Sequence, residues 1–192
     1  MQERYQMSEE TPNPQPKDDK KKGVVLVLTG PGKGKSSSAL GMVLRALGWG
    51  MRVCVIQFIK GQRKTGEEQA IQKFSNIEWH ALGDGFTWKT KDPEQDRITG
   101  RETWRFARQK IQTGCFDLVL LDEINYAAHY GWISGKEIAT FITHEKPAKT
   151  HLLLTGRNAP LEVIEVADTV TEMQAVKHAY EKGITAKRGI EF

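Results

Sequence analysis

The chain has 192 residues, of which 39% are hydrophobic and 27% are charged, and its net charge is +4. This composition is typical of a soluble globular protein with a single core, and no apolar run approaches the roughly 20 residues of a membrane helix. The polar start MQERYQMSEE lacks the apolar region of a signal peptide. We therefore predict a cytoplasmic protein without a membrane partner, and we expect Cys54 and Cys115, which lie in apolar runs, to be buried free thiols.

Two regions of different composition follow one another along the chain. Residues 1–22 are polar, with prolines at 12, 14 and 16, and they predict a flexible N-terminal segment. Residues 23–192 alternate short apolar runs with helical patterns, which indicates one α/β domain with a mostly parallel sheet. Six strands are expected, most of them continuously apolar because both faces of the sheet are covered: residues 24–28, 52–58, 77–81, 116–121, 151–155 and 169–173.

Three longer helices are expected between these strands. Residues 35–49 place apolar side chains at i, i+3, i+4 and i+7, namely Leu40, Val43, Leu44 and Leu47. Residues 93–113 begin with a proline at the first helical turn, and residues 134–145 form the third helix. The aromatic, glycine-containing stretch 83–92 is long enough to be a functional loop.

A glycine-rich segment, Thr29-Gly-Pro-Gly-Lys-Gly-Lys-Ser-Ser37, joins the first strand to the first helix. Glycines let backbone N–H groups turn toward one point, and the helix start adds its positive end, so the segment suits phosphate binding. Lys35 adds a mobile charge, and Ser36 can ligate Mg²⁺. Only three residues separate Gly30 from Gly34, where the common pattern has four. The surrounding strand and helix still favour a phosphate-binding loop over a glycine-rich surface turn.

Two carboxylates, Asp122 and Glu123, follow the apolar strand at 116–121. In P-loop proteins an acid at such a strand end holds Mg²⁺ beside the phosphates, although an aspartate there can also cap a helix. Together with the glycine-rich loop they predict a nucleotide-binding P-loop domain. Phosphate-binding loops occur in enzymes of many reaction types, so the loop and the two acids do not determine which reaction is catalysed.

The ordered set of segments between residues 24 and 192 resembles the CobA/BtuR-type corrinoid adenosyltransferases. Besides Thr29-Gly-Pro-Gly-Lys-Gly-Lys35, the resemblance depends on Gln57-Phe-Ile-Lys-Gly61, Gly85-Phe-Thr-Trp88, Leu121-Asp-Glu-Ile124, Thr155-Gly-Arg157, Ala167-Asp-Thr169 and Val176-Lys-His178. It implies a RecA-like P-loop NTPase fold and a homodimer. It also implies transfer of the 5′-deoxyadenosyl group of ATP, with Mg²⁺ or Mn²⁺, to Co(I) of a corrinoid that a flavoprotein has reduced, with release of triphosphate.

The resemblance also implies roles for individual residues. The triphosphate would be bound by Gly30, Pro31, Gly32, Lys33, Gly34, Lys35, Ser36 and Ser37, and Arg45 would reach a phosphate oxygen. The metal would be held by Ser36, Glu123 and Asp122. Phe86 and Trp88 would face the corrin and displace its lower axial ligand, so the catalytic set is Lys35, Glu123, Phe86 and Trp88.

Simpler structural roles compete with some of these assignments. Arg45 fits a salt bridge on a helix face equally well, and Phe86 and Trp88 could instead pin a loop. Pro31 stands where the family usually has asparagine, which removes a side-chain amide and a backbone donor. The five histidines show no metal-ligand spacing and are expected to be structural.

Other functions share the same phosphate loop. A RecA-like ATPase acting on nucleic acid would release phosphate rather than triphosphate, whereas the adenosyltransferase needs no nucleic acid. A small-molecule kinase would need a lid with several arginines, and residues 61–66 offer only Arg63 and Lys64. An ATP-dependent corrinoid sensor or chaperone also stays open, as does the choice between cobalamin and a precursor corrinoid.

Overall fold

The computed structural model describes residues 22–59, 65–83 and 93–190. Six strands form one all-parallel sheet with the order β3-β2-β4-β5-β1-β6. The strands are β1 Val25–Thr29, β2 Val53–Gln57, β3 Ile77–Ala81, β4 Leu118–Asp122, β5 His151–Thr155 and β6 Thr169–Glu172. All six predicted strands are confirmed to within two residues at each end, and so is the α/β class with a RecA-like P-loop arrangement.

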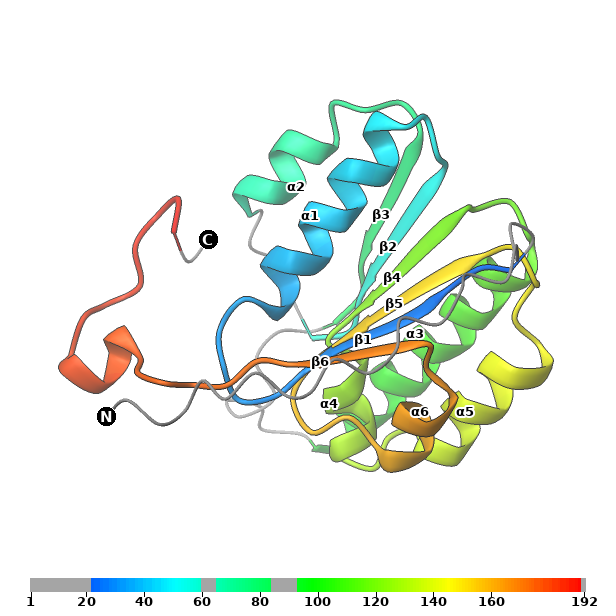
Figure 1. Ribbon diagram of the computed structural model, residues 1–192. Coiled ribbons are helices and arrows are strands. Elements are labelled where there is room, and N and C mark those ends of the chain that lie inside the picture. Colours follow the sequence, from blue (N-terminus) through cyan, green and yellow to red (C-terminus); the bar gives the residue numbers. More distant parts are fainter. Residues whose placement is uncertain (1–21, 60–64, 84–92, 191–192) are drawn as a thin grey trace, which may run out of the picture.

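Helices cover both faces of the sheet (Figure 1). On one face lie α1 Lys35–Gly48 and α2 Gly66–Ile71, and on the other lie α3 Pro93–Gln112, α4 Ile124–His129, α5 Gly135–His144 and α6 Leu161–Val166. The three predicted helices are confirmed as α1, α3 and α5. None of these elements is long and apolar enough to cross a bilayer, as far as the described residues go.

The core consists of two apolar layers, one on each face of the sheet. Helix α1 packs one side against β1, β2 and β4 through Ala39, Leu40, Val43, Ala46 and Leu47. The opposite layer is built on Trp104 and Ile111 of α3 and Phe141 of α5. One predicted core residue is wrong: Leu44 is 52% exposed, because it lies at the margin of the apolar stripe that faces the sheet.

The two cysteines have different environments. Cys54 is fully buried in β2, as predicted, but Cys115 is exposed, so the prediction for that residue is wrong. The strand expected from residue 116 begins only at Leu118. Cys115 instead lies in the turn after α3, next to Gly114 with its positive φ of 64°.

Residues 173–190 follow β6 and run away from the sheet, shown orange to red in Figure 1. They include a short 3₁₀ helix, η2 Ala179–Lys182, and expose Val176 (92%), Tyr180 (82%) and Ile190 (72%). The start of this segment touches the glycine-rich loop, because Gly32 N–H donates to the Met173 carbonyl over 2.6 Å. We call residues 173–190 the C-terminal segment.

The first two described residues, Lys22 and Gly23, already contact the folded part of the chain. Lys22 forms an ion pair with Asp168 at 2.8 Å, and Gly23 N–H donates to the Ala148 carbonyl over 2.6 Å. Residues 1–21 lie outside the described residues. The flexible N-terminal segment and the single domain from residue 23 therefore remain predictions.

Candidate active site

The carboxyl ends of β1, β5 and β4 form the edge where the predicted phosphate loop and the two acids meet. Strand β5 pairs with both β1 and β4, so it separates the loop after β1 from the carboxylates after β4. In open parallel sheets ligands bind in the crevice outside the carboxyl ends of the strands. The strand order therefore brings Thr29, Thr155 and Asp122 to one ligand-binding edge.

The loop after β1 requires glycine at several positions. Gly30 and Gly34 have φ angles of 93° and 114°, which favour glycine strongly, and Gly34 is the residue before α1. A Cβ atom on Gly30 would lie 2.5 Å from the Met173 carbonyl oxygen, and one on Gly32 would lie 2.7 Å from it. The glycines thus let the loop fold tightly against the C-terminal segment and lead into the N-terminus of α1.

Lys35 turns its side chain back into this loop. Its Nζ donates to the Gly30 carbonyl at 2.9 Å and to the Gly32 carbonyl at 2.5 Å. Burial and the positive charge of Arg157 lower the pKa of Lys35, and the Glu123 carboxylate opposes them. The ammonium group therefore lies among the loop carbonyls, close to the charges that follow β4 and β5.

ATP binding should be coupled to proton uptake by Lys35 at alkaline pH. Burial and Arg157 lower the pKa of Lys35, and an anionic triphosphate would raise it. Between these two pKa values the complex holds more protons than the free protein, so ATP affinity should fall as pH rises. Calorimetry in two buffers of different ionisation enthalpy measures the uptake. Lys35→Arg should remove it because the guanidinium group stays charged, and equal uptake in that variant would contradict the assignment.

The two adjacent carboxylates have different surroundings. Asp122 is buried, and both of its oxygens already accept hydrogen bonds, from Thr155 Oγ1 at 2.7 Å and from Gln57 Nε2 at 2.8 Å. Glu123 is half-buried and has a left-handed backbone with a φ of 66°. A non-glycine residue adopts this conformation at a cost, so the backbone changes direction at Glu123, directly after the strand. Asp122 ties the strands together, whereas Glu123 contributes a carboxylate at the edge.

Thr155 connects both acids through one hydroxyl. Its Oγ1 donates to Asp122 and accepts from the Glu123 N–H at 2.8 Å. Thr155→Val should lower the free energy of unfolding by about 2 kcal/mol or more, because a buried carboxylate oxygen and a backbone N–H lose their partner. Urea denaturation measures this loss, and Thr155→Ser, which keeps the hydroxyl, serves as the control. Equal stability of Thr155→Val and the parent would show that the hydroxyl is dispensable.

Arg157 is a site residue for which the sequence suggested no role. It follows Gly156, which has a φ of 127°, an angle that favours glycine. A Cβ atom added there would lie 2.9 Å from the Cβ atom of Asn125, so a larger residue would clash. The buried Asn125 donates from Nδ2 to the Gly156 carbonyl at 3.1 Å and holds this turn. The Arg157 charge lowers the pKa of Lys35 and partly offsets the rise that burial causes in the pKa of Tyr126. A charged residue two positions after an apolar strand was the available signal in the sequence.

The remaining predicted site residues lie in the loop, further along α1, or outside the described residues. Ser36 and Ser37 lie in the first turn of α1, and Pro31 and Lys33 are exposed in the loop. Arg45 lies ten residues after Lys35 in α1, which is about 15 Å along the helix axis. The helix therefore carries Arg45 away from the loop of its own chain. Its phosphate contact stays a prediction. Phe86 and Trp88 lie outside the described residues.

Comparisons with known proteins identify the family. Residues 21–192 match the family described as ATP:corrinoid adenosyltransferase BtuR/CobO/CobP. The chain is 45% identical to a corrinoid adenosyltransferase of Sinorhizobium, with 89% of this chain and 81% of the relative aligned. It is 46% identical to one of Pseudomonas aeruginosa (89% and 84% covered) and 35% identical to one of Escherichia coli (89% and 86% covered). With a family match over nearly its whole length and a phosphate-loop edge of this kind, the chain belongs to the ATP:corrinoid adenosyltransferase family.

Proposed function

We propose that this protein is a transferase that moves the 5′-deoxyadenosyl group of ATP onto the cobalt of a reduced corrinoid and releases triphosphate, in the biosynthesis of cobalamin cofactors. The observation that best supports this function is the position of the glycine-rich loop, with Lys35 at the start of α1, on the other side of β5 from Glu123. The chain that contains this arrangement is a member of the adenosyltransferase family. The arrangement provides a polyanion site beside an acid.

The chemistry asks the protein mainly to bind and to stabilise charge. The electron pair of Co(I) attacks C5′ of ATP, a cobalt–carbon bond forms, and the C5′–O bond breaks with its electrons going to triphosphate. The corrinoid supplies the nucleophile, so no protein base is needed. Negative charge grows on the leaving oxygen, and loop N–H groups, Lys35 and Arg157 would stabilise it.

Glu123 and Ser36 are the residues best suited to hold a divalent ion with the nucleotide. Both offer oxygen atoms, the ligands that Mg²⁺ and Mn²⁺ prefer. Asp122 fits less well because its two oxygens already accept hydrogen bonds from Thr155 and Gln57. When bound, such an ion would neutralise charge on the triphosphate. We therefore assign the first contact to Glu123, with Asp122 holding the strand end behind it.

Two protein partners belong to this proposal. A second copy of the chain would form a homodimer, and the exposed Val176, Tyr180 and Ile190 of the C-terminal segment support such an interface. A reduced flavoprotein would deliver the electron that converts Co(II) to Co(I). ATP and corrinoid are the substrates, and the reaction needs neither nucleic acid nor a membrane.

One anaerobic assay tests the function. The protein is incubated with ATP, Mg²⁺ and chemically reduced cobalamin, and the products are analysed for the cobalt–carbon bond and for triphosphate. Equal amounts of adenosylated corrinoid and triphosphate are expected. Release of phosphate without a cobalt–carbon bond would indicate an ATPase instead. ATP-dependent corrinoid binding without either product would indicate a chaperone.

Phe86 and Trp88 are proposed to exclude the lower axial ligand of the corrinoid. Replacing both with alanine should leave the affinity for ATP nearly unchanged. It should block adenosylation that starts from Co(II), and it should impair the reaction much less when Co(I) is made beforehand. Spectroscopy of Co(II) corrinoid with ATP-loaded protein should detect a four-coordinate species in the parent only. Detection of the four-coordinate species in the double variant would contradict this role and would indicate that the two rings only pack the loop.

A further inference from the structure

A cluster of three potential metal ligands lies away from the nucleotide edge, on the face of the sheet that α3 covers. It consists of Cys54 on β2 and of Glu78 and His80 on β3, and we call it the β2–β3 cluster. Cys54 pairs directly with Glu78 across the two strands, and His80 follows two positions later on the same face. Their ligand atoms all lie within 4.8 Å of one another. The strand register therefore makes a sulfur, an oxygen and a nitrogen converge.

We propose that the β2–β3 cluster binds a zinc-type divalent cation through Cys54 Sγ, a Glu78 carboxylate oxygen and His80 Nε2. Thiolate, imidazole and carboxylate are the three ligand types that Zn²⁺ uses. With metal–ligand bonds of about 2.0–2.3 Å in a tetrahedron, ligand atoms stand about 3.3–3.8 Å apart. Each ligand would have to move by only about 1 Å. The set provides three protein ligands and leaves a fourth position to solvent.

The β2–β3 cluster joins one buried residue to two partly exposed residues. Cys54 is 0% exposed, whereas the side chains of His80 and Glu78 keep 25% and 44% of their surface in contact with solvent. An ion would therefore meet Glu78 and His80 first, at the solvent side of the cluster, and Cys54 at its buried side. Phe106 of α3 packs edge-on against the His80 ring with centroids 4.8 Å apart, which restrains that imidazole. A fixed ring lowers the entropy lost on binding.

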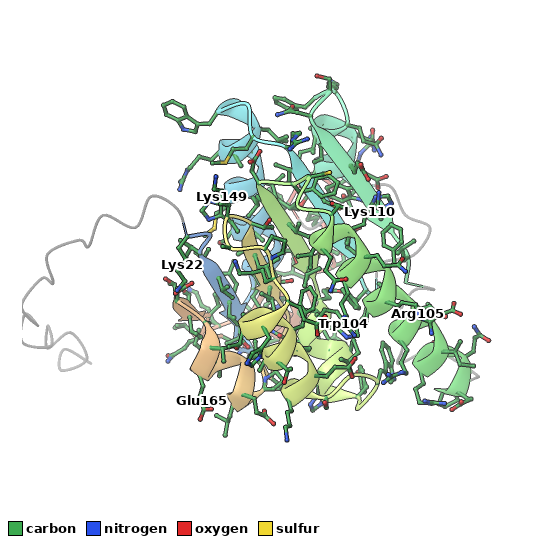
Figure 2. The ribbon with its side chains drawn as sticks, turned by 90° about the vertical axis from the view of Figure 1, so that its right-hand side faces the viewer. Lys22, Trp104, Arg105, Lys110, Lys149 and Glu165 are labelled. Carbon is green, nitrogen blue, oxygen red and sulfur yellow. The ribbon has the colours of Figure 1, made fainter. Side chains whose placement is uncertain are left out.

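Lys110 forms an ion pair with Glu78 of the β2–β3 cluster. Its Nζ lies 2.6 Å from Glu78 Oε2, and His80 Nε2 lies 3.0 Å from the same oxygen. Figure 2 shows Lys110 near the end of α3, beside the edge strand β3. The Lys110 side chain is 28% exposed, so it can swing into solvent when an ion takes the carboxylate. The ammonium group and the divalent ion are thus competitors for Glu78.

The thiol is protonated until an ion arrives. Burial, with a smaller effect from the Glu78 carboxylate, raises the pKa of Cys54 to about 12. A bound divalent cation deprotonates a coordinating thiol, and the proton passes to solvent. Occupancy would tie β3, which among the described strands pairs only with β2, more firmly to the sheet. His80 lies four positions before the segment 84–92, so this bond would steady the strand that leads into Phe86 and Trp88.

Co²⁺ provides the optical probe for this site. The full-length protein, free of nucleotide and corrinoid, is titrated with Co²⁺ and then with competing Zn²⁺. A thiolate-to-cobalt charge-transfer band is expected to saturate at one equivalent and to disappear as Zn²⁺ displaces the probe. Carboxylate sites such as the nucleotide edge cannot produce this band because they lack sulfur. No saturable band in the parent would overturn the proposal.

Two variants test proposed ligands, and a third serves as the control. Cys54→Ala and His80→Gln should each weaken binding by more than about 100-fold, beyond the 10–100-fold effect of losing an outer-shell partner. Cys115→Ser, which removes the exposed thiol, should leave both the band and the affinity unchanged. His80→Gln changes a partly exposed residue and keeps the test valid if Cys54→Ala unfolds. A band that survives both ligand changes, or that vanishes with Cys115→Ser, would place the metal elsewhere.

Lys110→Met tests the competition for Glu78. The variant keeps an apolar side chain of similar length but removes the ammonium group, whose Nζ lies 5.6 Å and 5.9 Å from the ring centroids of Phe106 and Phe116. Affinity for Zn²⁺ should rise by about two- to five-fold, the range that corresponds to one exposed ion pair. Unchanged or weaker binding would show that the ion does not take the Glu78 oxygen.

Discussion

Lys35→Ala is expected to lower adenosyl transfer by about 10²-fold or more, the scale of losing one strong electrostatic contact to the transition state. Lys35 is the residue whose ammonium group lies inside the loop, bonded to the carbonyls of Gly30 and Gly32. In the transition state the same charge would face the departing triphosphate. Turnover is measured with Co(I) corrinoid made chemically, so that reduction does not limit the rate.

Two controls separate charge from folding. Lys35→Arg keeps a cation and should retain more activity than Lys35→Met, which keeps the length of the side chain without the charge. Thermal unfolding of Lys35→Ala should stay close to that of the parent, since the lowered pKa of Lys35 indicates that burying its charge is unfavourable. Near-parental turnover in folded Lys35→Ala would remove the basis for a phosphate-binding loop.

Glu123→Ala is expected to raise the Mg²⁺ concentration needed for half-maximal turnover and to reduce turnover by at least about 10²-fold at fixed Mg²⁺. The expected effect exceeds that of an outer-shell loss, because the carboxylate is proposed to contact the ion itself. Asp122→Asn should change the metal requirement far less, since Asp122 is buried and bonded to Thr155 and Gln57. Turnover is followed over a Mg²⁺ titration in both variants. The reverse order of effects would move the metal contact to Asp122.

Glu123→Gly provides a matched control for the backbone. Both Glu123→Ala and Glu123→Gly lack the carboxylate, but glycine adopts the φ of 66° without steric cost. Glu123→Gly should therefore be more stable than Glu123→Ala by about 1 kcal/mol. If the two variants nevertheless lose the same activity, the loss belongs to the missing carboxylate rather than to a displaced turn.

The strands were predictable because their signal is local. The continuous apolar runs within Leu118–Asp122 and His151–Thr155 follow directly from burial on both faces. The short helices α2, α4 and α6 escaped prediction because each has only six residues, too few for a helical period to repeat. In α2 only Ile71 is buried, and in α6 only Val163 is.

The site was predictable only where one segment carries its own chemistry. The glycines, Lys35 and the two acids are adjacent in sequence to the strands that position them. The role of Thr155 depends on β5 lying between β1 and β4, and a threonine in an apolar strand otherwise suits that strand by its branched side chain alone. Likewise, the meeting of Cys54 with Glu78 and His80 depends on the β2–β3 register, which no local pattern contains.

The position of β1 between β5 and β6 has a consequence for the order in which the protein forms on the ribosome. Val25 of β1 pairs with Leu152 of β5, and Leu26 pairs with Thr169 of β6. Strand β1, the first of the described strands, thus waits for partners that appear more than a hundred residues later, or about 6–30 seconds at 5–20 residues per second. Pairings of this sequence separation are slow to form and leave an apolar strand uncovered meanwhile. The glycine-rich loop after β1 can therefore take its final place beside β5 and β6 only after residues 151–172 have been translated.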